Sequence, residues 1–199
     1  MPAIAGIVLA AGASMRMGAD KALLRWGERT FLEHLRGVLR AAGAEPVRII
    51  AGANAAALEQ AVPLAPGELV VNPTWEQGQL SSLLAGLDSL ASQTDAAIIC
   101  LVDHPCVSSR LLRSLMEKFL ETRRPIVLPT YQGRRGHPVL FAAALFDELR
   151  AAPLSVGARF VVHQHAADVL EVPTDEESIL LNTNDPAAYE RILQIPPPT

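Results

Sequence analysis

The sequence predicts an α/β fold: a mostly parallel central sheet with helices on both faces and an antiparallel segment. Two observations carry this prediction. Apolar runs alternate with amphipathic helical patterns over residues 1–125, which is typical of successive strand–helix–strand units. Residues 96–102 are uninterruptedly apolar, as expected for a strand buried on both faces in the middle of a parallel sheet.

The elements of residues 1–125 follow from their patterns. Thr30 and Glu33 have the spacing of a capping box, and Asn54 and Ser108 are expected to cap later helices. The expected strands are residues 4–10, 47–51, 69–72 and 96–102, and the expected helices are residues 30–42, 54–61, 81–90 and 108–122.

Residues 126–199 are more mixed, which predicts the antiparallel segment. A strand begins at residues 126–129, a polar turn or loop occupies residues 131–138, and residues 139–141 resume an extended run. Helices are expected over residues 142–150 and 157–165, strands over residues 168–172 and 178–181, and a last helix from Pro186. Because no linker divides the chain, we expect residues 1–199 to form one domain.

Composition excludes several classes of protein. Lys and Arg total 17 against 21 for Asp and Glu, a net charge of -4 that argues against a general nucleic-acid binder. Apolar runs are too short to cross a bilayer, and no secretory pattern opens the chain. Cys100 and Cys106 lack metal-motif spacing and are expected to be buried thiols. We therefore expect a cytoplasmic protein without a nucleic-acid or membrane partner.

The first strand runs into a loop of small residues that carries Arg16 and Lys21. Small residues let backbone N–H groups approach phosphate oxygens, and fixed cations neutralise phosphate charge. The loop matches neither G-x-G-x-x-G nor the P-loop. The pattern indicates a polyphosphate site; the alternative is two solvated surface cations.

Polar residues that follow two other expected strands are candidate metal ligands. Asp103 comes directly after the most apolar strand, where a carboxylate is costly without a partner. Mg²⁺ shared with a triphosphate would be such a partner; the alternative is a turn cap before Pro105. Asn182, after residues 178–181, offers a carbonyl oxygen to the same metal. His104 is expected to be structural or solvated.

The segment after residues 69–72 is a candidate contact for the base and ribose of a nucleotide. Asn72 and Gly78 are the residues expected to make those contacts. Ser81 and Ser82 either hydrogen-bond a ligand or cap the helix that they begin. Trp75 either stacks on a ligand or packs in the core.

Arg134, Arg135 and His137 form a second cationic cluster, suited to an anionic second substrate or else part of a solvated loop. The polar clusters that follow strand ends should converge, because ligands of such folds bind beyond the carboxyl ends of the strands. The residues supply phosphate and metal ligands without an obvious nucleophile. That combination favours phosphoryl or nucleotidyl transfer.

Three segments of the chain carry recognisable motifs. They read Leu9-Ala10-Ala11-Gly12-Ala13-Ser14-Met15-Arg16-Met17-Gly18-Ala19-Asp20-Lys21, Asn72-Pro73-x-Trp75-x-x-Gly78-x-x-Ser81-Ser82-Leu83 and Gly133-Arg134-Arg135-Gly136-His137-Pro138-Val139-Leu140-Phe141. The first resembles the signature L-A-[AG]-G-x-S-x-R-[MF]-G-x-x-K of the nucleotidyltransferases related to MobA and MocA of molybdenum cofactor biosynthesis, and the two later segments resemble the cytidylyltransferase branch of that family. The resemblance implies a Rossmann-like, GT-A type fold and nucleotidyl transfer from a nucleoside triphosphate to a phosphorylated acceptor, releasing pyrophosphate.

The resemblance also implies roles. Residues 1–125 become the nucleotide-binding part, and residues 126–199 bind the acceptor and complete the metal site. The base and ribose would be contacted by Leu9, Ala10, Ala11, Gly12 and Asn72, with Gly78, Ser81 and Ser82 beside them. The phosphates would be bound by Arg16 and Lys21, and the acceptor by Arg134, Arg135 and His137. Mg²⁺ (or Mn²⁺) would be bound by Asp103 and Asn182. The catalytic residues are then Arg16, Lys21 and Asp103.

The resemblance favours CTP, because the double-alanine form of the first loop goes with CTP and a double-glycine form with GTP. The expected activity is CMP transfer from CTP to molybdopterin or the molybdenum cofactor, with a molybdoenzyme or its chaperone receiving the product. The alternatives are GTP as donor, a sugar or isoprenoid phosphate as acceptor, and a non-catalytic protein that delivers a pterin cofactor.

Three departures from the family pattern bear on these expectations. Val102 replaces the glycine of the family's Gly-Asp-x-Pro stretch, which here reads Val102-Asp103-His104-Pro105. Residues 153–159 lack the acidic residue of the usual Gly-Asp-x-Gly-Ala-Arg, and Asn182 replaces a charged metal ligand by a neutral one.

Overall fold

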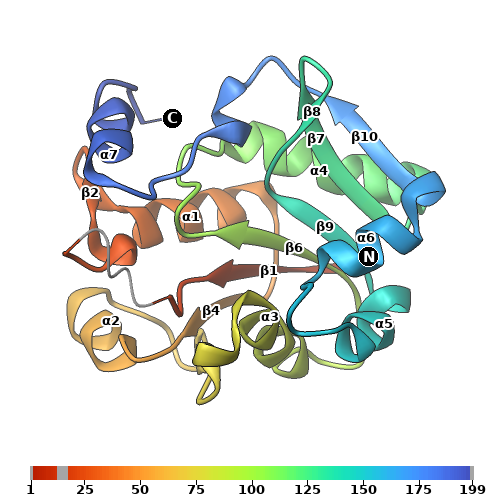
Figure 1. The fold of residues 1–199 in the computed structure, drawn as a ribbon, viewed down its shortest axis with the longest axis horizontal. Coiled ribbons are helices and arrows are strands. Elements are labelled where there is room, and N and C mark those ends of the chain that lie inside the picture. Colours follow the sequence, from red (N-terminus) through yellow and green to blue (C-terminus); the bar gives the residue numbers. More distant parts are fainter. Residues whose placement is uncertain (1, 13–17, 198–199) are drawn as a thin grey trace.

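The computed structural model describes residues 2–12 and 18–197, which form a layered α/β fold around one twisted sheet (Figure 1). The strands are β1 (Ala3–Leu9), β2 (Arg25–Trp26), β3 (Arg29–Thr30), β4 (Val47–Ala51), β5 (Leu69–Val71), β6 (Thr94–Leu101), β7 (Ile126–Tyr131), β8 (Arg134–Arg135), β9 (Val139–Ala142) and β10 (Val169–Pro173). The helices are α1 (Phe31–Ala42), α2 (Ala55–Ala61), α3 (Gln79–Asp88), α4 (Ser109–Thr122), α5 (Phe146–Ala151), α6 (Arg159–Gln164) and α7 (Pro186–Leu193). Short 3₁₀ turns η1 (Lys21–Leu23), η2 (Trp75–Gln77), η3 (Ala143–Leu145), η4 (Ala166–Asp168) and η5 (Glu177–Leu180) complete the set.

The main sheet has the strand order β10-β7-β9-β6-β1-β4-β5, with β8 paired to β7. Neighbours are parallel from β6 through β1 and β4 to β5, and also between β7 and β10. β9 lies antiparallel between β6 and β7. The predicted fold class is confirmed, and β9 is the expected antiparallel segment.

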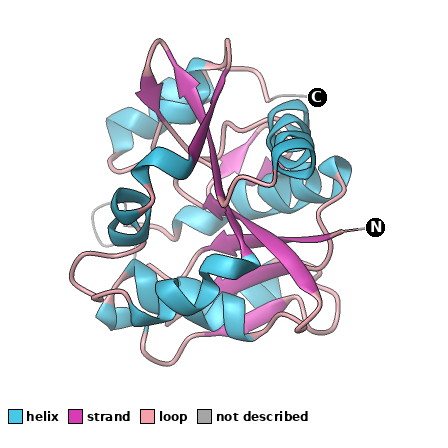
Figure 2. Cartoon of the chain, turned by 90° about the vertical axis from the view of Figure 1, so that its right-hand side faces the viewer, coloured by secondary structure: helices cyan, strands magenta, loops and turns pink. Residues whose placement is uncertain are grey.

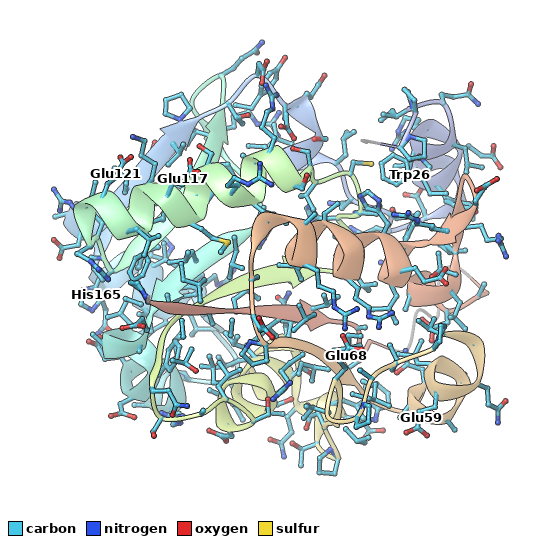
Figure 3. All side chains as sticks on the ribbon, turned by 180° about the vertical axis from the view of Figure 1, so that it is seen from behind. Trp26, Glu59, Glu68, Glu117, Glu121 and His165 are labelled. Carbon is cyan, nitrogen blue, oxygen red and sulfur yellow. The ribbon has the colours of Figure 1, made fainter. Side chains whose placement is uncertain are left out.

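Helices cover both faces of the sheet, as Figure 2 shows from the side. One core packs α1, α2 and α4 against one face, and a second packs α3, α5 and α6 against the other. Glu117 and Glu121 project from α4 away from the sheet (Figure 3), which leaves the apolar stripe of that helix facing the core.

Helix boundaries follow local chemistry where the sequence carried a clear signal. The capping box of α1 is present: Thr30 N–H donates to Glu33 at 2.8 Å, and Glu33 N–H donates to Thr30 Oγ1 at 3.2 Å. The backbone hydrogen bond from Thr30 is the main cause of the lowered pKa of the Glu33 carboxyl. Ser108 caps α4 as predicted, since its Oγ accepts from Leu111 N–H at 3.0 Å.

One predicted helix cap and one predicted helix start are wrong. α2 begins directly after Asn54, as expected, but Asn54 makes no side-chain cap bond to it, because its amide is engaged by other segments. α3 begins at Gln79, before Ser81 and Ser82, because Gly78 adopts a φ of 103° that ends the preceding turn.

One prediction for the C-terminal part is also wrong, and another is incomplete. Residues 178–181 are not a strand: they overlap η5, which buries Ile179 completely and directs its carbonyl toward the backbone N–H of His137 at 3.1 Å. The expected turn or loop over residues 131–138 contains a turn at residues 132–133, but β8 follows it and pairs with β7 through Thr130 and Arg135.

The other elements of this part match in kind. The helical stretch at residues 142–150 divides into η3 and α5, and α6 is shorter than the expected 157–165. Cys100 and Cys106 are buried free thiols, as expected, and burial raises the pKa of each to about 12. Within the described part of the chain, no helix is both long and apolar enough to span a membrane.

The last helix packs on the hairpin formed by β2 and β3. Trp26, labelled in Figure 3, lies beside α7 and donates its indole N–H to the carbonyl of Ile195 at 2.8 Å. Tyr189 donates its hydroxyl to the carbonyl of Arg25 at 2.7 Å and packs edge-to-face on Phe31. This packing brings the segment before α7 next to the residues that precede the hairpin, although more than 150 positions separate them in the sequence.

Candidate active site

A cleft of about 480 Å³ opens beyond the carboxyl ends of the central strands. Leu9, at the end of β1, pairs with Ile50 on β4 and with Leu101 on β6, so the three strands end side by side. The cleft is lined by Leu9, Ala11, Gly12, Lys21, Trp75, Glu76, Gly78, Gln79, Ser82, Leu101, Val102, Asp103 and Asn184. Polar clusters that the sequence separates by more than 150 residues therefore meet at one edge of the sheet, as predicted.

Lys21, Asp103 and Asn184 form the polar centre of this cleft. The Lys21 ammonium lies 2.8 Å from Asn184 Oδ1 and 3.4 Å from Asp103 Oδ2. The side chains of Lys21 and Asp103 are 15% and 27% exposed, so both are reachable from the cleft. Asp103 lies two residues beyond the end of β6, in the turn that follows the strand. This arrangement supplies a cation and two oxygen ligands at one point.

Asn184, rather than Asn182, occupies this centre. Asn182 is exposed and is absent from the cleft lining, whereas Thr183 between them is fully buried and donates its backbone N–H to the Asp103 carbonyl at 2.7 Å. Asp185 caps α7 by accepting from Ala188 N–H at 2.8 Å. The backbone bond to Asp103 fixes which asparagine turns inward, and nothing in the sequence marks that bond.

The predicted base and ribose contacts divide into lining residues and supporting residues. Gly78 and Ser82 line the cleft. Asn72 is buried and donates to Ser81 Oγ at 2.9 Å and to Ser82 Oγ at 3.0 Å. Ser81 in turn donates to the Gly78 carbonyl at 2.8 Å. Asn72 and Ser81 therefore hold the turn that shapes the cleft.

The predicted first loop is described only in part. Leu9, Ala11 and Gly12 line the cleft, and Ala10 is buried just beneath, with its N–H bonded to the Ile50 carbonyl at 2.9 Å. Arg16 lies outside the described residues, so its predicted phosphate contact stays a prediction.

Trp75 lines the cleft against Gly52, a residue that sequence reasoning missed. A Cβ added at Gly52 would lie 2.6 Å from both the Ala11 carbonyl oxygen and Trp75 Cγ. Glycine is therefore required where β4 ends, because both the first loop and the indole approach its backbone. Its only sequence signal is a glycine directly after an apolar run.

Replacing Gly52 with alanine is expected to raise the KM for the nucleotide and to lower the free energy of unfolding by about 1–3 kcal/mol, the usual cost of overpacking. Gly37→Ala is the matched control, because the nearest atom to its added Cβ is a flexible Arg29 nitrogen at 3.6 Å. The control should stabilise α1 by up to about 1 kcal/mol. Thermal melting and initial rates over a nucleotide titration measure both effects; equal behaviour of the two variants would contradict the prediction.

A second pocket of about 520 Å³ adjoins the first and shares Leu9, Gln79 and Leu101 with it. Much of its lining is apolar, and its polar lining comes from the shared Gln79 and from Arg135, His137, Arg159 and His163. Of the predicted acceptor residues, Arg135 and His137 line this pocket and Arg134 does not. Arg159 and His163, at α6, were not predicted.

His137 is not cationic, which corrects the predicted basic cluster. Burial, together with the neighbouring His104, lowers the pKa of His137 to about 4. The two imidazole rings lie 4.9 Å apart between their centroids. Burial also lowers the pKa of His104, against the raising effects of Asp103 and of a backbone hydrogen bond with Ile179. The cationic character of the second pocket rests on its arginines, of which Arg135 is paired with Glu171 at 2.7 Å.

The donor set fits a hard divalent cation. Asp103 offers carboxylate oxygens and Asn184 a carbonyl oxygen, and both already lie against the cationic Lys21 ammonium. Mg²⁺ is commonly held by one or two carboxylates together with substrate phosphates and water. No group of three or more histidine, cysteine or acidic side chains suited to a metal occurs among the described residues. The cation would therefore depend on the nucleotide for several of its ligands.

The fold and the cleft together define a nucleotidyltransferase. Residues 6–169 match the family described as the MobA-like NTP transferase domain. The chain belongs to this family, which confirms the resemblance inferred from the loop motifs.

Two similar proteins have names that describe different activities. A probable molybdenum cofactor guanylyltransferase of Mycobacterium avium is 30% identical over 195 residues, covering 96% of this chain and 95% of the relative. The nicotine blue oxidoreductase of Paenarthrobacter nicotinovorans is 36% identical over 155 residues, covering 73% of this chain and 74% of the relative.

Solved structures agree with the fold. Rv0371c of Mycobacterium tuberculosis H37Rv superimposes with a TM-score of 0.87 at 29% identity, covering 98% of both chains. A manganese complex of Rv0371c has a TM-score of 0.80 at 26% identity, covering 98% of this chain and 99% of that one.

Proposed function

We propose that this protein transfers a guanylyl group from GTP to the phosphate of a molybdopterin-type acceptor and releases pyrophosphate. The observation that carries the proposal is the convergence of Lys21, Asp103 and Asn184 in a cleft that adjoins a second, arginine-rimmed pocket. The choice of GTP, instead of the CTP expected from the first loop, is supported by the guanylyltransferase names of relatives aligned over 195 residues.

The reaction needs positioning and charge neutralisation more than covalent help from the protein. An acceptor phosphate oxygen forms a bond to the α-phosphorus, and the bond from that phosphorus to the bridging oxygen breaks, so that pyrophosphate leaves with the electron pair. Lys21 stabilises the negative charge that develops on the phosphate oxygens. Asn184 and Asp103 orient the Lys21 ammonium through their contacts at 2.8 and 3.4 Å.

A divalent cation, Mg²⁺ or Mn²⁺, would be held by Asp103 and Asn184 and would supply further neutralisation of the triphosphate. The second pocket would hold the acceptor, with Arg135 and Arg159 at its rim and the neutral His137 in its wall. The shared residues Leu9, Gln79 and Leu101 let the acceptor phosphate approach the nucleotide without leaving the protein surface. A molybdoenzyme or its chaperone in the cytoplasm would receive the product.

CTP is the second candidate donor, and Ala10-Ala11 in the first loop favours it. The two donors differ in the base alone, so the choice lies in the contacts around Ala11, Trp75 and Gly78.

The test is pyrophosphate release with GTP, CTP, ATP and UTP, each with Mg²⁺ and molybdopterin. The proposal predicts that GTP gives the highest kcat/KM and that release requires the acceptor. A preference for CTP would replace the donor and leave the reaction class intact. Nucleotide binding without release across molybdopterin, sugar phosphates and isoprenoid phosphates would contradict catalysis and favour a cofactor-delivery protein.

A further inference from the structure

The side chain of Asn54 connects three segments around the first loop. Its Nδ2 donates to the Ala10 carbonyl at 2.9 Å and to Asp20 Oδ2 at 2.7 Å. Its Oδ1 accepts from the backbone N–H of Gly52 at 3.1 Å. Both hydrogens of the amide are thus used, on segments that lie more than 30 positions away in the sequence.

These partners flank the loop on both sides. Ala10 directly follows β1, and Asp20 immediately precedes Lys21. The other oxygen of Asp20 accepts from Ala22 N–H at 2.9 Å and caps η1, the turn that begins with Lys21. A continuous chain of hydrogen bonds therefore runs from Asn54 through Asp20 to the turn that carries the cleft lysine.

We propose that Asn54 is a positioning residue for the triphosphate loop: it sets the separation of the two loop ends and the orientation of Lys21 without touching the nucleotide. The inference rests on the proposed function, because it assigns the loop to a nucleotide. Asn54 is absent from the cleft lining and makes no cap bond to α2, so neither direct binding nor helix capping accounts for its contacts.

The amide is the chemistry that this place requires. One group must donate to a carbonyl and to a carboxylate while accepting from a backbone N–H, and an asparagine amide has that inventory. An aspartate at this position would face the Asp20 carboxylate with like charge and could not donate to the Ala10 carbonyl. An alanine would leave the Asp20 oxygen and the Gly52 N–H without these partners.

The test compares Asn54→Ala and Asn54→Asp with Ala56→Gly. Ala56 is exposed in α2, so its replacement weakens that helix without touching the loop. We expect both Asn54 variants to raise the KM and the Kd for GTP by about 10- to 100-fold, the size usual when a hydrogen-bond partner that orients a metal ligand is lost. The KM for the acceptor should stay unchanged, and Ala56→Gly should lower the Tm with nucleotide affinity unchanged.

A double-mutant cycle with Asp20→Ala tests whether Asn54 acts through Asp20. We expect the double variant to lose no more GTP affinity than whichever single variant binds GTP more weakly, because both replacements cut the same chain of hydrogen bonds. Additive losses, an unchanged GTP Kd, or an equal loss in Ala56→Gly would each overturn the inference. Direct measurement of GTP and CTP binding distinguishes failure of the proposed function from failure of the role assigned to Asn54. If the wild type binds neither nucleotide, both are contradicted. If wild type and Asn54→Ala bind a nucleotide equally well, only the role of Asn54 is contradicted.

Discussion

Replacing Asp103 with alanine is expected to lower kcat/KM for nucleotidyl transfer by about 100- to 1,000-fold, the size typical of losing one electrostatic contact to a developing charge. Asp103 is the carboxylate of the polar centre, and the Lys21 ammonium lies 3.4 Å from it. Under the proposed function, its loss removes both a ligand of the divalent cation and a contact that orients Lys21. Initial rates of pyrophosphate release over a Mg²⁺ titration measure the effect, which should be largest at limiting Mg²⁺.

Asp95→Ala is the matched control for this prediction. Asp95 lies near the start of β6, the strand that Asp103 follows. It is exposed and accepts a hydrogen bond from Ala3 N–H at 2.7 Å. The control variant also removes one negative charge, and we expect its kcat/KM to equal that of the wild type. Unchanged transfer by Asp103→Ala at limiting Mg²⁺ would contradict a role for Asp103 in nucleotidyl transfer.

Replacing Lys21 with alanine is expected to raise the KM for the nucleotide and to lower kcat, with a combined loss of about 100- to 1,000-fold in kcat/KM. The ammonium contacts Asp103 and Asn184, so the variant removes the cation that we propose to bind phosphate and leaves Asp103 without that contact. Steady-state kinetics with separate titrations of nucleotide and acceptor distinguish the two effects. The acceptor KM should change little.

Lys118→Ala is the control for lysine removal. Lys118 is exposed on α4, away from the cleft, and pairs with Glu121 three residues later. Its replacement changes the net charge equally and should leave the kinetics as in the wild type. If Lys21→Ala retained the wild-type KM and kcat, the phosphate-binding assignment of the first loop would be wrong.

The sequence predicted the sheet and most helices because their signals are local. The apolar run of β6 and the capping box at Thr30 depend on residues close together in the chain. Residues 178–181 failed as a strand because their conformation is set from outside: Ile179 buries its side chain and offers its carbonyl to His137, a distant neighbour. A short apolar run such as residues 179–181 does not distinguish a strand from a buried turn.

The candidate site was predictable in outline, since strand ends bring Lys21 and Asp103 together. Its details depend on tertiary contacts that leave no pattern in the sequence. Asn184 replaces Asn182 because the buried Thr183 binds the backbone of Asp103. His137 is neutral because its ring is buried against His104, and residue type alone does not reveal burial.

The most direct test of the central claim is transfer of a radiolabelled α-phosphate from the nucleoside triphosphate to molybdopterin, with wild type and Asp103→Ala compared at limiting Mg²⁺. We expect wild type to move the label to the acceptor with one pyrophosphate released per label transferred, and Asp103→Ala to lose nearly all of this activity. Label that never reaches an acceptor, or equal transfer by both proteins, would contradict the assignment of this cleft as a nucleotidyl-transfer site.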